Sequence, residues 1–187
     1  MTQGNHPDTF LGHTNPPLSP RGQAQAVALA GALLSEPLVA VYTSPLERAR
    51  ATAREVALRH GLAPSMDERL CEQSFGLWEG RTFAEAKRRY PEDYAAWQAG
   101  AGAATPTEGE SLAQVAARHL SLCRDLHSRH PYETVALVGH GGGLSALLCG
   151  LLHTPLHALW PYRLALGSVS EVVVYPEGVV LTRLSHA

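Results

Sequence analysis

Cysteine pairs and long apolar runs are missing from this sequence, and each absence excludes a class of protein. The three cysteines, Cys71, Cys123 and Cys149, are scattered and form no Cys-x-x-Cys pair, which argues against a disulfide framework or a zinc knuckle. No apolar run approaches the roughly 18 residues that a membrane-spanning helix needs. No basic and apolar leader opens the chain. These absences predict a cytoplasmic protein without a membrane partner.

A large excess of charge of either sign is also missing. The formal net charge of −2 gives no attraction to nucleic acid or to an anionic membrane surface. Lys87 is the only lysine, so nearly all of the basic side chains are arginines, whose planar guanidinium binds anions through paired hydrogen bonds. The length of 187 residues and the 45% hydrophobic content are typical of a soluble globular protein and predict a single domain over residues 1–187.

Strands alternate with helices in the hydrophobic pattern. Buried strands are predicted over residues 38–42 and 134–138, and a closing hairpin over residues 171–184. Capping signals at Ser19-Pro20, 44–47, 82–85 and 111–114 predict four helix starts, and a further helix is predicted over 144–152. This alternation predicts an α/β fold, a three-layer α/β/α sandwich with a mostly parallel central sheet.

The most distinctive stretch joins the strand at 134–138 to the helix that follows it. It reads Gly-His-Gly-Gly-Gly over residues 139–143. His140 is therefore predicted at the carboxyl edge of the sheet, where open α/β sheets bind their ligands. Glycines at a helix N-terminus leave amide groups uncovered, so an anion can dock there. On its own, this position is equally compatible with a polar turn residue, and further motifs are needed to decide.

Four motifs occur in order along the chain. They are Thr-Ser-Pro-Leu-Glu-Arg-Ala at 43–49, Leu-x-Glu-x-x-Phe-Gly-x-Trp-Glu-Gly at 70–80, Gly-Glu-Ser at 109–111 and Val-Gly-His-Gly-Gly at 138–142. Together they resemble the histidine phosphatase superfamily, in its phosphoglycerate-mutase-like branch, over about residues 2–170. The resemblance implies phosphoryl transfer through a phosphohistidine on a small phosphorylated substrate, without a metal or other cofactor. The α-ribazole phosphatases and broad-specificity phosphatases share these motifs. The short segment 81–108 favours a phosphatase over a mutase, because mutases of the family carry a longer insertion there.

The resemblance also implies roles for individual residues. Arg48 would clamp the phosphoryl oxygens, Glu72 would protonate the leaving oxygen, and His140 would stabilise the transferring phosphoryl group. Residues matched to phosphate-binding positions are Asn5, Gly12 and Gly141.

One departure from the family pattern concerns the nucleophile. The Arg-His-Gly motif, which carries it at the end of the family's first strand, is absent from this chain, whereas Thr2 and Asn5 match the residues that follow this motif. We therefore expect the first strand and the nucleophilic histidine to be encoded upstream of Met1. The alternatives are a non-catalytic protein that binds a phosphorylated ligand, and a nucleophile supplied by His6 or His13 from a loop. The sequence does not identify the substrate, and it is compatible with a homodimer.

Other residues have simpler interpretations. Ser44 is predicted to cap a helix rather than to act as a catalytic hydroxyl. Trp78, Trp97 and Trp160 are predicted to pack in the interior, with Trp97 or Tyr94 a candidate for the mouth of a pocket. The remaining histidines are predicted at the surface, among them His127, His130, His153 and His157.

Overall fold

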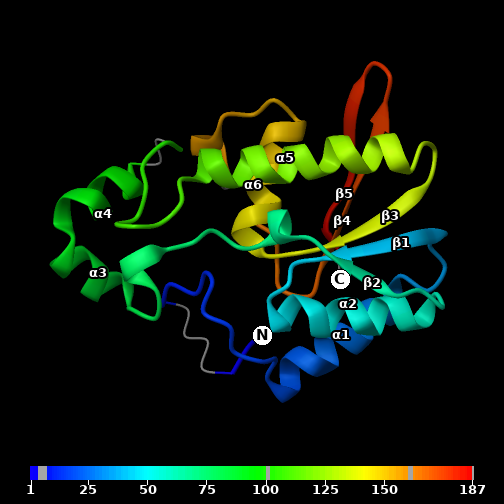
Figure 1. Cartoon of the computed structure of the whole chain (residues 1–187), viewed down its shortest axis with the longest axis horizontal. Coiled ribbons are helices and arrows are strands. Elements are labelled where there is room, and N and C mark those ends of the chain that lie inside the picture. Colours follow the sequence, from blue (N-terminus) through cyan, green and yellow to red (C-terminus); the bar gives the residue numbers. More distant parts are fainter. Residues whose placement is uncertain (4–7, 100–101, 160–161, 187) are drawn as a thin grey trace.

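Helices and strands alternate along most of the chain. The computed structural model describes residues 1–3, 8–99, 102–159 and 162–186 (Figure 1). The helices are α1 (Pro20–Ala32), α2 (Glu47–Arg59), α3 (Phe83–Arg89), α4 (Pro91–Gln98), α5 (Leu112–Arg129) and α6 (Gly141–Leu151). The strands are β1 (Leu38–Thr43), β2 (Pro64–Met66), β3 (Thr134–Val138), β4 (Val169–Tyr175) and β5 (Gly178–His186).

The central sheet is parallel, with strand order β2-β1-β3. Successive side chains of a strand point to opposite faces of the sheet, and a hydrophobic cluster lies on each face. Val41 and Val138 belong to a core cluster with residues of α1 and α2. Tyr42 and Leu137 contact Leu122 of α5 on the other face. Each face of the sheet is therefore buried under helices.

The layers agree with the predicted three-layer α/β/α arrangement. Helices α1 and α2 cover one face of the sheet, and α5 and α6 lie on the other (Figure 1). Within the described part of the chain, none of the helices is long and apolar enough to cross a bilayer. The layers leave the carboxyl ends of β1 and β3 side by side at one edge of the sheet.

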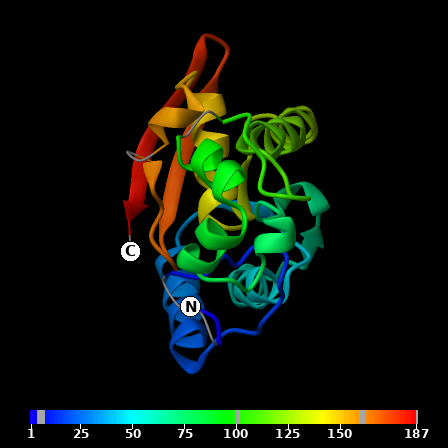
Figure 2. The same ribbon diagram turned by 90° about the vertical axis from the view of Figure 1, so that its left-hand side faces the viewer.

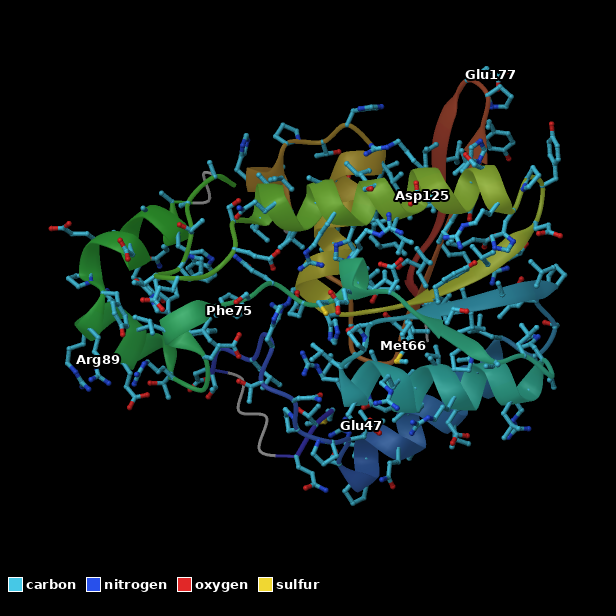
Figure 3. The ribbon with its side chains drawn as sticks, viewed as in Figure 1. Glu47, Met66, Phe75, Arg89, Asp125 and Glu177 are labelled. Carbon is cyan, nitrogen blue, oxygen red and sulfur yellow. The ribbon has the colours of Figure 1, made fainter. Side chains whose placement is uncertain are left out.

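The predicted hairpin forms, but it makes a sheet of its own. Strands β4 and β5 pair antiparallel and run along one side of the molecule (Figure 2), with Glu177 at the tip of the hairpin (Figure 3). Among the described residues, β3 pairs with β1 alone, so its other edge carries no strand. Val135 to Val138 are only half-buried as a result.

Three of the four predicted helix caps are confirmed. Ser19 accepts a hydrogen bond from the Gly22 amide at the start of α1. Reciprocal capping boxes join residues 82 and 85 at the start of α3, and 111 and 114 at the start of α5. The prediction that Ser44 caps α2 is wrong. Helix α2 starts later, at Glu47, whose amide donates to Asn15 Oδ1 instead (2.7 Å).

An aromatic cluster joins α3 and α4 to the rest of the molecule. Phe75 lies on the segment that leads from the sheet to these helices (Figure 3). Its ring and that of Phe10 pack with Trp78, Tyr94 and Trp97. Trp78 is completely buried, which confirms its predicted role in packing, and Trp97 contacts the same rings. The third tryptophan, at position 160, lies outside the described residues.

Candidate active site

The side chains that follow β1 and β3 meet at the carboxyl edge of the sheet. His140 comes directly before α6, and Arg48 lies in the first turn of α2. Arg48 Nε donates a hydrogen bond to His140 Nδ1 over 3.1 Å. The parallel register of β1 and β3 brings these two residues, 92 positions apart in the sequence, into direct contact.

His140 is buried and neutral. An arginine side chain can only donate, so His140 Nδ1 must accept and the ring proton lies on Nε2. This Nε2–H donates to Ser44 Oγ over 2.9 Å, and the Leu46 amide donates to the same oxygen. Burial, followed by the positive charge of Arg48, lowers the pKa of His140 well below 6.5. Ser44 therefore fixes the imidazole, a role that sequence reasoning missed because the two residues are distant in the chain.

The remaining donors of Arg48 face a loop near the start of the chain. Nη1 donates to the Thr14 carbonyl oxygen (2.8 Å) and Nη2 to that of Gly12 (2.6 Å). Burial lowers the pKa of Arg48, and the carboxylates of Glu72 and Glu79 oppose this effect. The Arg48 guanidinium is thus half-buried, its charge is partly balanced by two carboxylates, and its donors are held by the loop and by His140.

Glu72 occupies the N-terminus of α6. Its Oε2 accepts from the Gly142 amide (3.1 Å) and its Oε1 from the amides of Gly143 (2.9 Å) and Gln73 (2.9 Å). A Cβ atom at residue 142 would lie only 2.8 Å from Glu72 Oε1, so this approach requires glycine. The anion bound by these helix amides is thus a side chain of the protein itself.

The loop that faces Arg48 is held by Glu79, which follows a short 3₁₀ helix (η2, Gly76–Trp78). The amides of Gly12, His13 and Thr14 donate to its carboxylate, as does the Thr14 hydroxyl. The Phe75 amide donates as well. The motif at 70–80 includes Glu79, but it does not reveal this role, because the loop that Glu79 holds lies more than 60 positions away in the sequence.

Arg118 holds the segment that carries Glu72. Its guanidinium donates to the carbonyl oxygens of Arg69 (2.8 Å), Cys71 (2.7 Å) and Glu72 (2.9 Å). The Glu110 carboxylate accepts from Nε and Nη2 of the same side chain. This clamp was also missed, because its targets are backbone atoms that no sequence pattern identifies.

A cavity of about 500 Å³ opens beside these residues. Its lining mixes acidic and basic side chains with the Cys71 thiol, which lies 3.8 Å from Ser44 Oγ. The lining residues are His13, Pro45, Glu68, Arg69, Cys71, Glu110 and Arg118. A polar molecule is the ligand that such walls can accommodate.

The six residues predicted for the site have different surroundings. Arg48 and His140 touch each other, and Glu72 binds the glycine amides just after His140. The Gly12 amide donates to Glu79, whereas the Gly141 amide has no partner among the described residues. The sixth predicted residue, Asn5, lies outside the described residues. Within the same described ranges, no three His, Cys, Asp or Glu side chains are grouped as a metal site requires.

The surface prediction for the remaining histidines is wrong for His119. It is completely buried in α5, and its Nδ1 lies 2.9 Å from the Val115 carbonyl oxygen. Its Nε2 is buried without a hydrogen-bond partner, close to Gly143. Burial lowers the pKa of His119 from 6.5 to about 4. By contrast, the histidines at 127, 153 and 157 are exposed, as predicted, whereas His130 is half-buried, with Nε2 2.8 Å from the Tyr42 hydroxyl.

Known proteins with similar sequences and structures are phosphatases. The chain matches the Histidine phosphatase superfamily (branch 1) over residues 1–186. It is 32% identical to phosphoserine phosphatase 1 of Hydrogenobacter thermophilus over 176 residues, which are 94% of this chain and 83% of that protein. It is 33% identical to adenosylcobalamin/alpha-ribazole phosphatase of Salmonella typhimurium over 171 residues, or 91% of this chain and 85% of that protein.

A solved structure extends this similarity to the fold. The native structure of mycobacterial glucosyl-3-phosphoglycerate phosphatase superposes with a TM-score of 0.91 at 29% identity. The match covers 100% of this chain and 95% of that one. These relatives are named for small phosphorylated compounds, and the phosphoglycerate-mutase-like architecture is common to them and to this chain. The chain belongs to branch 1 of the histidine phosphatase superfamily.

Proposed function

We propose that this protein is a cytoplasmic, metal-independent phosphatase that hydrolyses a small phosphomonoester through a phosphohistidine. The observation that carries the proposal is the direct contact of Arg48 with His140 at the sheet edge, beside the Glu72 carboxylate. Arg48, His140 and the Gly141 amide would supply hydrogen-bond donors for a phosphoryl group. The Glu72 carboxyl group would transfer the proton.

Binding of the phosphoryl group requires these donors to change partners. Arg48 now donates to two loop carbonyls and to His140. Dianionic phosphoryl oxygens are stronger acceptors than peptide carbonyls, so they replace at least one of these partners. His140 Nε2–H is held by Ser44 and turns to a phosphoryl oxygen when that oxygen competes with the hydroxyl. Both residues then stabilise the negative charge of the equatorial oxygens during transfer.

In the proposed reaction, a histidine nitrogen attacks phosphorus while the bond from phosphorus to the leaving oxygen breaks. Glu72 delivers the proton that the leaving oxygen takes up, and its carboxyl group must release one amide when it carries that proton. Water then attacks the phosphohistidine while Glu72 takes up one of its protons, and the bond from phosphorus to the histidine nitrogen breaks to release inorganic phosphate and the free histidine. The oxygens and protons balance over the two steps, with one water consumed.

We further propose that the attacking histidine is carried by a strand that pairs with the free edge of β3. The half-buried residues of β3 support this placement, since a further strand would cover them. A parallel strand beside β3 would end at the same sheet edge as His140. The nucleophile would then face Arg48 across the phosphoryl site.

The cavity lined by Cys71, the residue before Glu72 in the chain, supports a small, polar leaving group. Its charged lining includes Arg69, Arg118, Glu68 and Glu110. Such a lining would suit a molecule that carries both a positive and a negative charge, or several hydroxyl groups. Phosphoserine, α-ribazole phosphate and glucosyl-3-phosphoglycerate, the compounds in the names of the relatives, are all polar phosphomonoesters. We therefore place the substrate in this chemical class.

The test compares two proteins: the chain of 187 residues, and the same chain extended by the codons in frame upstream of Met1. We expect the extended protein to hydrolyse at least one phosphomonoester of a panel and to form an acid-labile phosphoenzyme. Arg48→Ala or His140→Ala should lower its turnover by about 100-fold or more. Lys87→Ala, a change at an exposed helix position, is the matched control.

Two results would contradict the proposal. The first is an upstream stop codon together with phosphate binding but no phosphoenzyme, which would establish the alternative of a non-catalytic phospho-ligand-binding protein. The second is loss of activity in EDTA with recovery on adding Mg²⁺, since we assign the positive charge at the site to Arg48 and not to a metal ion.

A further inference from the structure

Glu79 is not one of the residues that we propose to contact the phosphoryl group, yet both oxygens of its carboxylate accept hydrogen bonds. Oε1 accepts from the amides of His13 (2.8 Å) and Phe75 (3.1 Å). Oε2 accepts from the amides of Gly12 (3.3 Å) and Thr14 (2.9 Å) and from the Thr14 hydroxyl (2.6 Å). Four of these five donors belong to three consecutive residues of the loop, which are thereby bound to a single half-buried carboxylate.

Two of these three residues also contact Arg48. The Gly12 and Thr14 carbonyl oxygens accept from Nη2 and Nη1 of Arg48, while Nε donates to His140. The peptide units of the loop therefore donate to Glu79 and accept from Arg48. A displacement of Glu79 would move the carbonyl oxygens that set the plane of the guanidinium.

The loop closes tightly on the carboxylate. A Cβ atom at Gly12 would lie 2.2 Å from Glu79 Oε1 and 2.3 Å from the Gln73 carbonyl oxygen. The base of Glu79 is fixed as well, because the preceding Trp78 is completely buried in the aromatic cluster. Burial raises the pKa of Glu79, but the hydrogen bonds from Thr14 and the amides outweigh it and keep the pKa below 4.5. The carboxylate is thus ionised and rigidly held.

We propose that Glu79 is a positioning residue that orients the Arg48 guanidinium toward the phosphoryl group through the backbone of residues 12–14. The proposal rests on the proposed function in one respect, the assignment of phosphate binding to Arg48. Glutamine cannot replace Glu79, because its amide nitrogen at either position would face two backbone N–H donors. The main effect of Glu79 on phosphate binding therefore passes through Arg48, whose two loop partners Glu79 holds in place.

A double-mutant cycle with inorganic phosphate as the probe tests this coupling. We expect Glu79→Gln to weaken phosphate binding by about tenfold or more in calorimetric titrations of the full chain. In the Arg48→Ala background the same change should have less than about a twofold effect, because the group that it positions is gone. Equal losses in both backgrounds would show a general structural role and overturn the proposal.

Glu85→Gln is the matched control. Glu85 also accepts from a backbone amide and a hydroxyl, those of Thr82, but it does not contact the loop. We expect this variant to change phosphate affinity by less than about twofold. Thr14→Val provides a milder perturbation that removes one donor to Glu79, and it should weaken phosphate binding in the same direction by a smaller factor. If Glu79→Gln does not fold, an unchanged affinity in Thr14→Val overturns the proposal.

A second measurement separates this inference from the phosphatase proposal. In the ¹⁵N spectrum, the Arg48 Nε–H, assigned by its loss in Arg48→Lys, should exchange slowly with solvent because it donates to His140. Glu79→Gln should speed this exchange by about tenfold or more, and Glu85→Gln should leave it unchanged. If the wild-type chain bound no phosphate, the proposed function would fail, and the exchange rate alone would decide the role of Glu79. An exchange rate of the Arg48 Nε–H that is unchanged in Glu79→Gln would overturn the positioning role of Glu79.

Discussion

At the scale of the residue, the neutral imidazole of His140 sets the chemistry of the site. Its two ring nitrogens contact different kinds of partner, the obligate donor Arg48 and the hydroxyl of Ser44. A neutral ring with a fixed proton can donate one hydrogen bond to an anion without first losing or gaining a proton. In the proposed phosphoryl site, His140 would therefore offer this donor at neutral pH without changing its protonation state.

The pKa of His140 gives a direct test of this arrangement. We expect Arg48→Ala to raise that pKa, because the variant removes the positive charge that is the second cause of its depression. Burial remains, so the pKa should stay below 6.5. Titration of the ring carbon-bound protons by NMR measures the change. A pKa that fell, or that did not move, would contradict the contact between these side chains.

Gly12 allows a second test at this scale. A methyl group there would collide with the backbone oxygen of Gln73, which cannot move as a side chain could. We expect Gly12→Ala to displace the loop and to weaken phosphate binding by about tenfold or more. Gly31→Ala in α1 is the control, since nothing lies within 4 Å of a Cβ atom at that position. The control should stabilise the protein by about 0.5–1 kcal/mol, measured by urea denaturation.

At the scale of the element, local signals predicted the helix starts well where the cap partner is close in sequence. Ser111 and Gln114 form the predicted capping box three residues apart, as do the residues at 82 and 85. Ser44 misled the prediction because its strongest partner, His140, lies 96 positions away. The same reason explains why the roles of Glu79 and Arg118 could not be predicted, whereas Arg48 and His140 could be proposed from motifs.

The capping box of α5 carries a prediction of its own. Ser111→Ala removes the acceptor for the Gln114 amide, over 3.2 Å, at the start of an 18-residue helix. We expect the free energy of unfolding to fall by about 1 kcal/mol. Ser128→Ala in the same helix removes only a bond to the Arg124 carbonyl oxygen and should change stability by less than about 0.5 kcal/mol. Equal effects of the two changes would contradict the assignment of the cap.

At the scale of the whole molecule, the alternation of strands and helices was enough to predict the layers. It did not predict that β4 and β5 would form a separate sheet, because pairing between distant strands leaves no mark in local patterns. The buried His119 was missed for a similar reason. It belongs to α5, and only the packing of this helix against the start of α6 encloses its ring.

His119 makes the stability of the whole molecule depend on pH. The unfolded chain protonates this histidine below about pH 6.5, whereas the folded chain does so only near its pKa of about 4. The unfolded state thus binds more protons in this window, and the free energy of unfolding falls as the pH is lowered through it. The shift corresponds to on the order of 3 kcal/mol.

The test is a series of urea denaturation curves between pH 7 and pH 4. We expect the decline in stability to be markedly smaller in His119→Leu, which removes the titrating group and its unpaired Nε2. His127→Leu, at an exposed position of the same helix, is the control and should keep the slope of the wild type. A wild-type stability that rose on acidification would contradict the sign of this effect.

The free edge of β3 also bears on how the chain behaves in a concentrated solution. Among the described residues no strand pairs with this edge, and an unpaired strand edge is a template on which another chain can add a strand. Such edge-to-edge growth has no natural end point, so the chain should form sheet-rich aggregates faster as its concentration rises. The tendency of the chain to aggregate thus depends on whether another strand covers this edge of β3.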